Sequence, residues 1–91
     1  MTKEIKKLLG AHQSLNHSED MKVVSHVQRD TKEWILNTLM IEGCDVAFKY
    51  KRKKMYRNIE GKRVNLTYYP AQENVAGIDI EVMKVVRIKI A

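Results

Sequence analysis

The fold prediction starts from residues 46–69, whose sequence is VAFKYKRKKMYRNIEGKRVNLTYY. Apolar residues alternate with polar ones in both halves of this stretch. They occupy even positions each time, from Val46 to Tyr50 and from Val64 to Tyr68. A period of two is typical of a half-buried β-strand. The stretch therefore predicts two strands whose even-numbered residues face the core.

A hairpin through the loop Ile59-Glu60-Gly61 would join these two strands. Directly opposed residues of an antiparallel pair lie on the same face, so their numbers must add to an even sum here. This loop satisfies that condition, and it places Gly61 at the left-handed position that a three-residue loop requires. We expect Tyr56 to pair with Val64.

The end of the chain has the same alternation. Apolar residues recur at every second position between Ile78 and Ile90, except at Lys84. This pattern predicts a third strand over residues 78–90. Pro70 and Gly77 bound the preceding segment, and both residues interrupt strands, so we expect residues 70–77 to form a loop.

The chain before Gly43 has a different period. Residues 3–12 predict a short helix, and residues 19–42 predict a long one whose apolar side chains share one side of a helical wheel. Ser18 is a candidate N-cap. We expect the long helix to be continuous, with a break near Asp30 as the alternative. Trp34 lies on the apolar side and is expected in the core.

The predicted fold class is α+β, because helices precede a run of strands. We expect a single domain over residues 1–91, with two layers. One short and one long N-terminal helix would pack on a three-stranded antiparallel meander, in the order α-α-β-β-β. The 44% apolar content is sufficient for a core in a chain of this size.

The net charge of +6 is concentrated in one segment. Between residues 49 and 63, Glu60 is the single acid among eight cations, and such a local field indicates an anionic partner. We hypothesise that this basic segment binds nucleic-acid phosphates, with an aromatic residue beside the cations for stacking. The candidate residues are Lys49, Lys51, Arg52, Lys53, Lys54, Arg57, Lys62, Arg63 and Tyr69. Alternatively, the same charges keep a sheet edge soluble.

A second hypothesis concerns the strand 78–90. Its far half is rich in β-branched residues, and without a partner in the monomer it would be an edge for two-fold pairing. Val86 and Ile88 are the candidate homodimer contacts. In this alternative the protein is an interaction or structural module, and the basic segment serves solubility.

The sequence indicates a binding module rather than an enzyme. It contains no glycine-rich phosphate loop, and no pair of carboxylates is spaced for acid–base chemistry. The three histidines and the single Cys44 lack zinc-ligand spacing. We therefore expect no catalytic residues, no cofactor and no metal. No segment is apolar enough for a membrane span, and we expect a cytoplasmic location.

Overall fold

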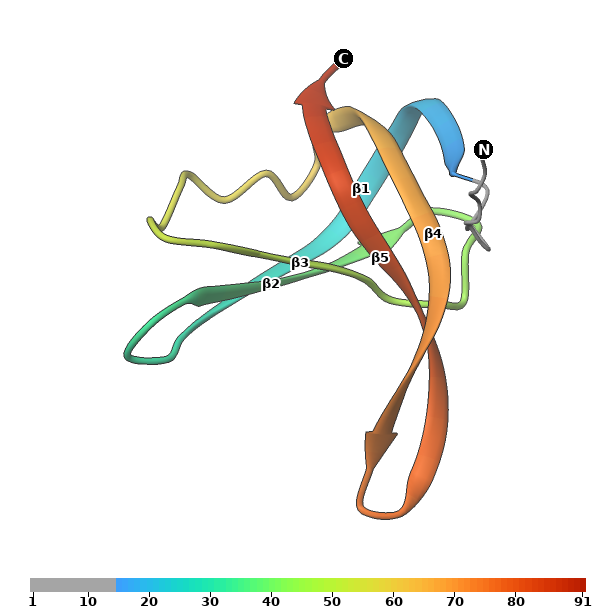
Figure 1. Cartoon of the computed structure of the whole chain (residues 1–91). Coiled ribbons are helices and arrows are strands. Elements are labelled where there is room, and N and C mark those ends of the chain that lie inside the picture. The colour runs from blue at the N-terminus through green and yellow to red at the C-terminus, as the bar shows by residue number, and fades with distance from the viewer. Residues whose placement is uncertain (1–14) are drawn as a thin grey trace, which may run out of the picture.

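The computed structural model describes residues 15–91, which form five strands arranged as a closed barrel (Figure 1). The strand order around the barrel is β1-β2-β3-β5-β4, and β4 closes on β1. β3 and β5 are parallel, and all other neighbours are antiparallel. This connectivity is that of the OB fold, a five-stranded Greek-key barrel. The strands are β1 (Asn16–Asp30), β2 (Ile35–Ile41), β3 (Phe48–Arg52), β4 (Arg63–Val75) and β5 (Ile78–Ile90).

The α+β prediction is wrong, because the described residues contain no helix. The predicted helix 3–12 lies outside these residues. The predicted helix 19–42 is instead the antiparallel pair of β1 and β2, and the chain reverses directly after Asp30. Thr31 closes the turn, since its backbone N–H and its hydroxyl both donate to the carbonyl of Trp34, at 2.8 and 2.9 Å.

Two bulges in β1 explain why its sequence has a helix-like period. Extra residues lie between Ser18 and Met21 and between Val23 and Ser25, so the pairing shifts by one residue at each place. Inward positions, identified by their inward partners on β2 and β4, are therefore two or three residues apart. Across the two bulges they are Ser18, Met21, Val23, His26 and Gln28. This spacing resembles a helical pattern more than a strict alternation.

In β2 the outward residues conceal the alternation. Ile35, Leu39 and Ile41 are buried, but the outward Leu36 and Met40 are apolar as well. The pattern therefore lacks the polar residues that mark a half-buried strand.

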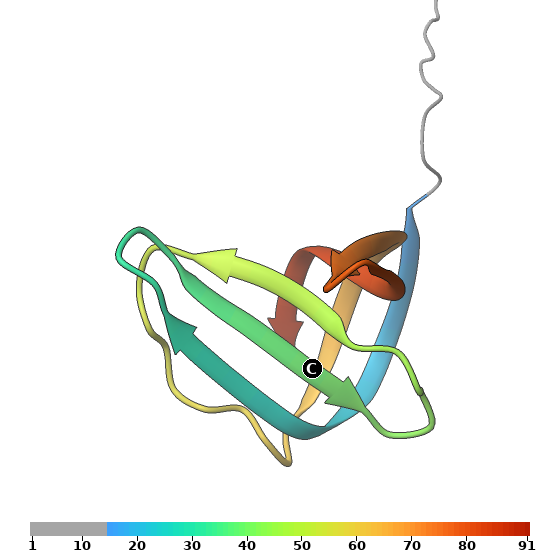
Figure 2. The same ribbon diagram turned by 90° about the horizontal axis from the view of Figure 1, so that it is seen from below.

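The predicted hairpin over 46–69 is wrong in its pairing but correct in its faces. Phe48, Val64 and Leu66 are buried as expected, yet β3 pairs with β2 and β5 rather than with β4. Residues 53–62 lead from the end of β3 around the β1–β2–β3 sheet to β4 (Figure 2). Gly61 has the expected positive φ, 85°, but its N–H donates to the carbonyl of Val23 in β1, at 2.7 Å.

β4 takes β5 as its hairpin partner instead, and the predicted loop 70–77 is wrong. Ala76 and Gly77 form the turn with φ of 52° and 84°, as in a two-residue type I′ hairpin. So short a turn costs less loop-closure entropy than the ten-residue connection from β3. Pro70 is tolerated within β4 because β1 pairs with β4 only as far as Tyr68, which leaves the next residues at an edge.

Figure 1 shows the β4–β5 hairpin projecting from the barrel, beyond the last pairing of β4 with β1. The core lies inside the barrel. The strand predicted over residues 78–90 is present as β5. The buried cluster contains residues from four strands, so the core is complete only when these strands are together in the barrel. Its members are Val23, Leu39, Ile41, Phe48, Val64 and Leu66.

Candidate nucleic-acid interface

One row of outward side chains crosses all five strands. Val27 on β1 is paired with Thr38 on β2, and Thr38 with Lys49 on β3. Lys49 is paired with Lys84 on β5, and Lys84 with Tyr69 on β4. Directly paired residues point to the same side of a sheet, so these five side chains share one outer face.

A shorter row lies beside the first. Arg29 is paired with Leu36 on β2, and Leu36 with Lys51 on β3. Residues of both rows line a groove of about 620 Å³, together with the projecting β4–β5 hairpin. The groove is therefore built by strand register and not by a single segment of the sequence.

The groove combines cationic, aromatic and exposed apolar side chains. Its cations outnumber its acids, because Glu73 is the one carboxylate among the lining residues. Two of its apolar side chains are exposed to solvent, Val27 at 57% and Val86 at 55%. Exposed apolar surface rimmed by charge marks a binding groove. The cationic side chains are those of Arg29, Lys49, Lys51 and Lys84.

Trp34 lies beside the groove and not in the core, which corrects the sequence-based prediction. It is half-buried on the turn between β1 and β2. The Lys53 ammonium is 4.2 Å from the centroid of its ring and that of Lys51 is 5.1 Å away. Both distances are within the range of cation–π attraction. Lys51 lies over the indole and also lines the groove, so Trp34 is next to the groove.

Glu73 bridges two lysines of the long row. Lys49 Nζ donates to one carboxylate oxygen at 2.7 Å, and Lys84 Nζ lies 3.5 Å from the other. The hydrogen bond from Lys49 holds the pKa of the Glu73 carboxyl below its ordinary value. The three side chains are only partly exposed, at 34%, 29% and 41% for Lys49, Glu73 and Lys84.

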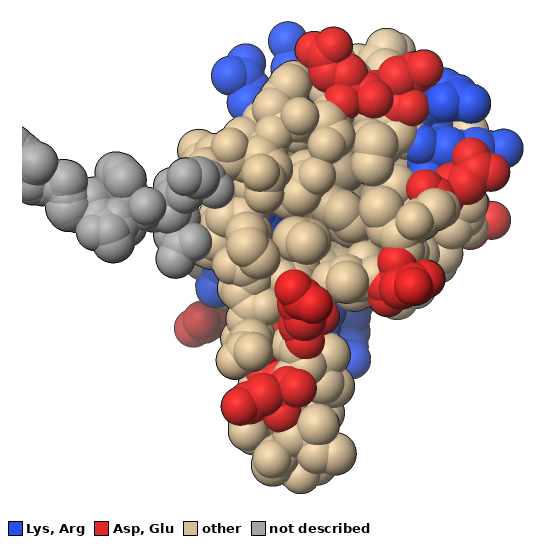
Figure 3. Space-filling model, turned by 90° about the vertical axis from the view of Figure 1, so that its right-hand side faces the viewer, with Lys and Arg blue, Asp and Glu red and all other residues tan. Residues whose placement is uncertain are grey.

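The charge of the projecting hairpin is opposite to that of the groove. Residues 70–83 contain three acids and no Lys or Arg. Acidic side chains are correspondingly visible on the projecting lower part of the molecule in Figure 3. Two of these acids, Asp79 and Glu81, are exposed, whereas Glu73 turns into the groove.

A smaller cavity of about 160 Å³ is lined mainly by residues of β3, the 53–62 segment and the end of β5. The Arg52 guanidinium lies over the ring of Tyr56, at 4.7 Å, and over that of Tyr50, at 5.4 Å. Burial raises the pKa of the Tyr50 hydroxyl, and Arg52 partly offsets this effect. Arg57 and the buried His26 also line the cavity.

The nine residues predicted to contact nucleic acid fall into separate groups. Lys49, Lys51 and Tyr69 line the groove, and Lys53 lies near it, over Trp34. Arg52 and Arg57 line the smaller cavity, and Lys54 is exposed in the 53–62 segment. Lys62 is exposed before β4, and Arg63 contacts Asp20 on β1. Three of the nine predicted residues therefore line the groove, and a fourth, Lys53, lies near it.

Sequence reasoning missed most of this surface, including two of its four cationic residues and the neighbouring Trp34. Arg29 and Trp34 fall within the segment predicted as a helix, and Lys84 was read as a charge interrupting a buried face. Only the strand register places Arg29 and Lys84 beside Lys49 and Lys51. No local sequence signal identifies them.

The residues predicted to form a homodimer occupy different environments. Val86 is exposed and lines the groove. Ile88 packs against the core and is paired with Leu66 on β4. The far half of β5 thus has a partner within the barrel along one edge, contrary to the premise of the dimer hypothesis. Dimerisation itself stays a prediction.

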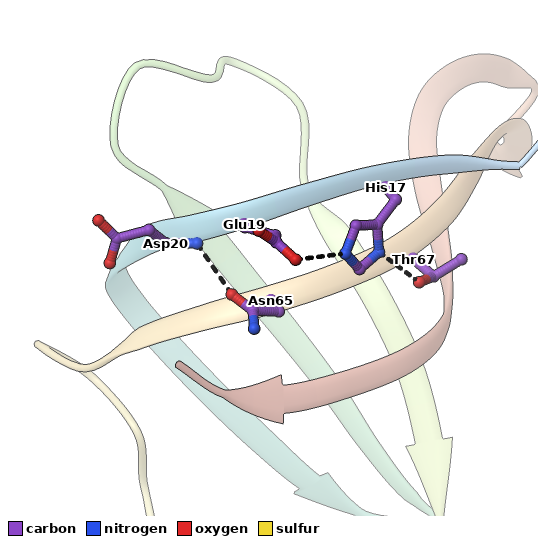
Figure 4. A network of polar contacts seen from close by, with 5 residues as sticks. All are labelled: His17, Glu19, Asp20, Asn65 and Thr67. Carbon is purple, nitrogen blue, oxygen red and sulfur yellow. Dashed lines mark hydrogen bonds and ion pairs between the residues drawn. The ribbon is translucent and has the colours of Figure 1, made fainter.

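A polar network stabilises the first bulge of β1 (Figure 4). His17 hydrogen-bonds to Thr67 Oγ1 at 2.9 Å through Nδ1, and to Glu19 at 3.2 Å through Nε2. The backbone N–H of Asp20 donates to Asn65 Oδ1 at 2.9 Å, and Asp20 has a φ of 58°. These hydrogen bonds give the side chains of the network a structural role at the bulge. Within residues 15–91, no group of three His, Cys, Asp or Glu is arranged to hold a metal ion.

Comparisons with family models, curated proteins and solved structures give no match to this chain. In the part of the chain that the structure describes, no helix has the length and apolar character to cross a membrane.

Proposed function

We propose that this protein binds single-stranded nucleic acid in the groove across its five strands. The observation that carries this proposal is the long row from Val27 to Tyr69. In this row Lys49 and Lys84 lie between Thr38 and the partly exposed Tyr69, and the exposed Val27 lies at one end. Proteins that bind single strands combine a cationic groove, which follows the phosphates, with aromatic rings on which bases stack.

Different residues would make the phosphate contacts and the base-stacking contacts. Arg29, Lys49 and Lys51 supply positive charge along the groove. Trp34 and Tyr69 supply rings at its borders, and stacking on such rings tolerates any base. We therefore expect affinity for many sequences, with little preference among them.

The fold supports the same proposal by analogy. In OB folds, the face of the second and third strands and the loops at its two ends bind oligonucleotides or oligosaccharides. Fold alone does not decide between these ligands. The cationic character of the groove favours the polyanion, because an uncharged sugar gains little from four cationic side chains.

The test is binding of a fluorescently labelled oligothymidylate of about 12 nucleotides, within the range that one OB fold covers. Anisotropy is measured from about 50 mM to about 300 mM salt. Three to five phosphate contacts give a plot of log affinity against log salt with a slope of about −2 to −4. A duplex of the same length should bind more weakly, since its bases cannot stack on the rings.

Two double variants separate the groove from general charge. Lys49→Gln with Lys51→Gln should reduce the magnitude of the slope by about 1.4 units, at roughly 0.7 per contact. The control is Lys22→Gln with Lys62→Gln, which removes the same charge from exposed residues outside the groove. Equal effects of the two doubles, or no binding by the unmodified protein at about 50 mM salt, would refute the proposal.

A further inference from the structure

We infer that Lys49 and Lys84 form a phosphate subsite which the Glu73 carboxylate occupies until a strand displaces it. This inference rests on the proposed function and names one position within that same groove. Each oxygen of Glu73 faces a different lysine, at 2.7 and 3.5 Å. A phosphodiester also presents two anionic oxygens, so it can take the place of the carboxylate between the same two donors.

The position of the lysines favours a shared ligand. They are direct partners in the parallel pair of β3 and β5, so their side chains leave the sheet on the same face. They lie at the centre of the long row, with Thr38 on one side and Tyr69 on the other. A phosphate bound there would place its neighbouring base near the Tyr69 ring.

Glu73 reaches this point from a different part of the molecule. It belongs to the stretch of β4 beyond Tyr68, where β1 no longer pairs with the strand. Its carboxylate is on a flexible side chain at the border of the groove, and solvent reaches it. Ion pairs that are partly exposed contribute little free energy, so an incoming phosphate can exchange with the carboxylate.

The lowered pKa of Glu73 is consistent with this arrangement, because the carboxylate stays ionised near neutral pH and competes as an anion. The other two acids of the hairpin have no ion-pair partner among the described residues. Of the three, Glu73 alone is placed to act as a substitute for a ligand.

The experiment measures oligothymidylate affinity of Glu73→Gln at about 150 mM salt. Removing the competing carboxylate should tighten binding by about two- to fivefold, a gain of the size expected from one partly exposed ion pair. Glu81→Gln is the matched control, since it removes the same charge from the same hairpin without touching the lysines. Its effect should stay below about twofold because salt screens distant charges.

A double-mutant cycle identifies the lysine involved. Lys84→Gln should abolish most of the gain from Glu73→Gln, because the subsite then lacks one donor. The gain should also disappear with a methylphosphonate oligothymidylate, whose backbone is uncharged. Circular dichroism melting of each variant confirms that the barrel is folded before binding is compared.

Three outcomes overturn the inference. Equal effects of Glu73→Gln and Glu81→Gln would mean that only overall charge matters. Weaker binding by folded Glu73→Gln would mean that the carboxylate orients the lysines for the ligand. A gain that persists with the uncharged backbone would remove the phosphate from the explanation. In each of these cases, binding by the unmodified protein leaves the proposed function intact, whereas its absence refutes the proposed function.

Discussion

Inside the barrel, His26 Nδ1 accepts a hydrogen bond from the backbone N–H of Ile59, at 3.0 Å. The other ring nitrogen of His26 is 2.8 Å from Asn37 Oδ1. Asn37 is oriented by its own amide, which donates to the carbonyl of Ile35 at 3.2 Å. The Nε2 of His26 must therefore donate while its Nδ1 accepts, which defines the orientation of the ring. It joins β1, β2 and the 53–62 segment.

Replacing this imidazole should destabilise the barrel. His26→Phe leaves the N–H of Ile59 and the amide oxygen of Asn37 without their partner, and we expect a loss of about 2–4 kcal/mol in the free energy of unfolding. Urea denaturation followed by circular dichroism measures it. Lys54→Phe is the control, because Lys54 is exposed and its replacement should change stability by less than about 0.5 kcal/mol. A similar loss in the free energy of unfolding in both variants would show that the buried hydrogen bonds of His26 do not stabilise the barrel.

Gly61 provides a test of the backbone alone. Its φ is 85°, and a Cβ placed there would meet no atom within 4 Å. Gly61→Val should therefore destabilise by about 1–2 kcal/mol through backbone strain, without a steric clash. Gly61→Asn should cost clearly less, because asparagine tolerates the left-handed region. Thermal melting compares the two, and equal costs would contradict the strain argument.

Trp34 should matter for binding more than for folding. Because its ring is half-buried beside the groove, Trp34→Ala should cost only about 1–2 kcal/mol of stability. Phe48→Ala, in the core, should cost about 3–5 kcal/mol. Oligothymidylate affinity of Trp34→Ala should fall by about 1–3 kcal/mol through lost stacking, and Trp34→Phe should retain most of it. Unchanged affinity of a folded Trp34→Ala would remove the indole from the interface.

The depressed pKa of Glu73 predicts a small dependence of stability on pH. Its contribution is present above the ordinary value of 4.5 and is lost as pH falls through the lower value of the folded state. The side chain is partly exposed, so the contribution stays below about 1 kcal/mol. Melting curves of the unmodified protein and of Glu73→Gln should differ at neutral pH and converge in acid, once the pH is below the lowered pKa of the folded state. A constant difference would contradict a stabilising ion pair.

The extent to which sequence alone could predict this fold depends on the segment. Alternation correctly located β3, the first part of β4 and β5, because each has polar residues between its apolar ones. It could not give the pairing, which depends on a competition between β3 and β5 for β4. It misassigned residues 19–42, where bulges and outward apolar side chains produce a helix-like period.

The sequence likewise predicted some residues of the groove and not others. Lys49, Lys51 and Tyr69 were found because they lie in the basic segment or directly after it. Arg29 and Lys84 join them only through register, which is a property of the closed sheet. The basic segment therefore identified the groove residues of β3 and Tyr69 on β4, but it missed the cationic residues of β1 and β5.

The row that crosses all five strands has a thermodynamic consequence. Val27 and Lys84 come from opposite ends of the described chain, so opening any strand of the barrel divides the groove. A ligand bound along the row therefore stabilises only the fully closed barrel and has no affinity for partly opened forms. At a hundred times its dissociation constant it would add about 2.7 kcal/mol to the free energy of global unfolding. Amide hydrogen exchange should slow together in all five strands, although the ligand touches a single face.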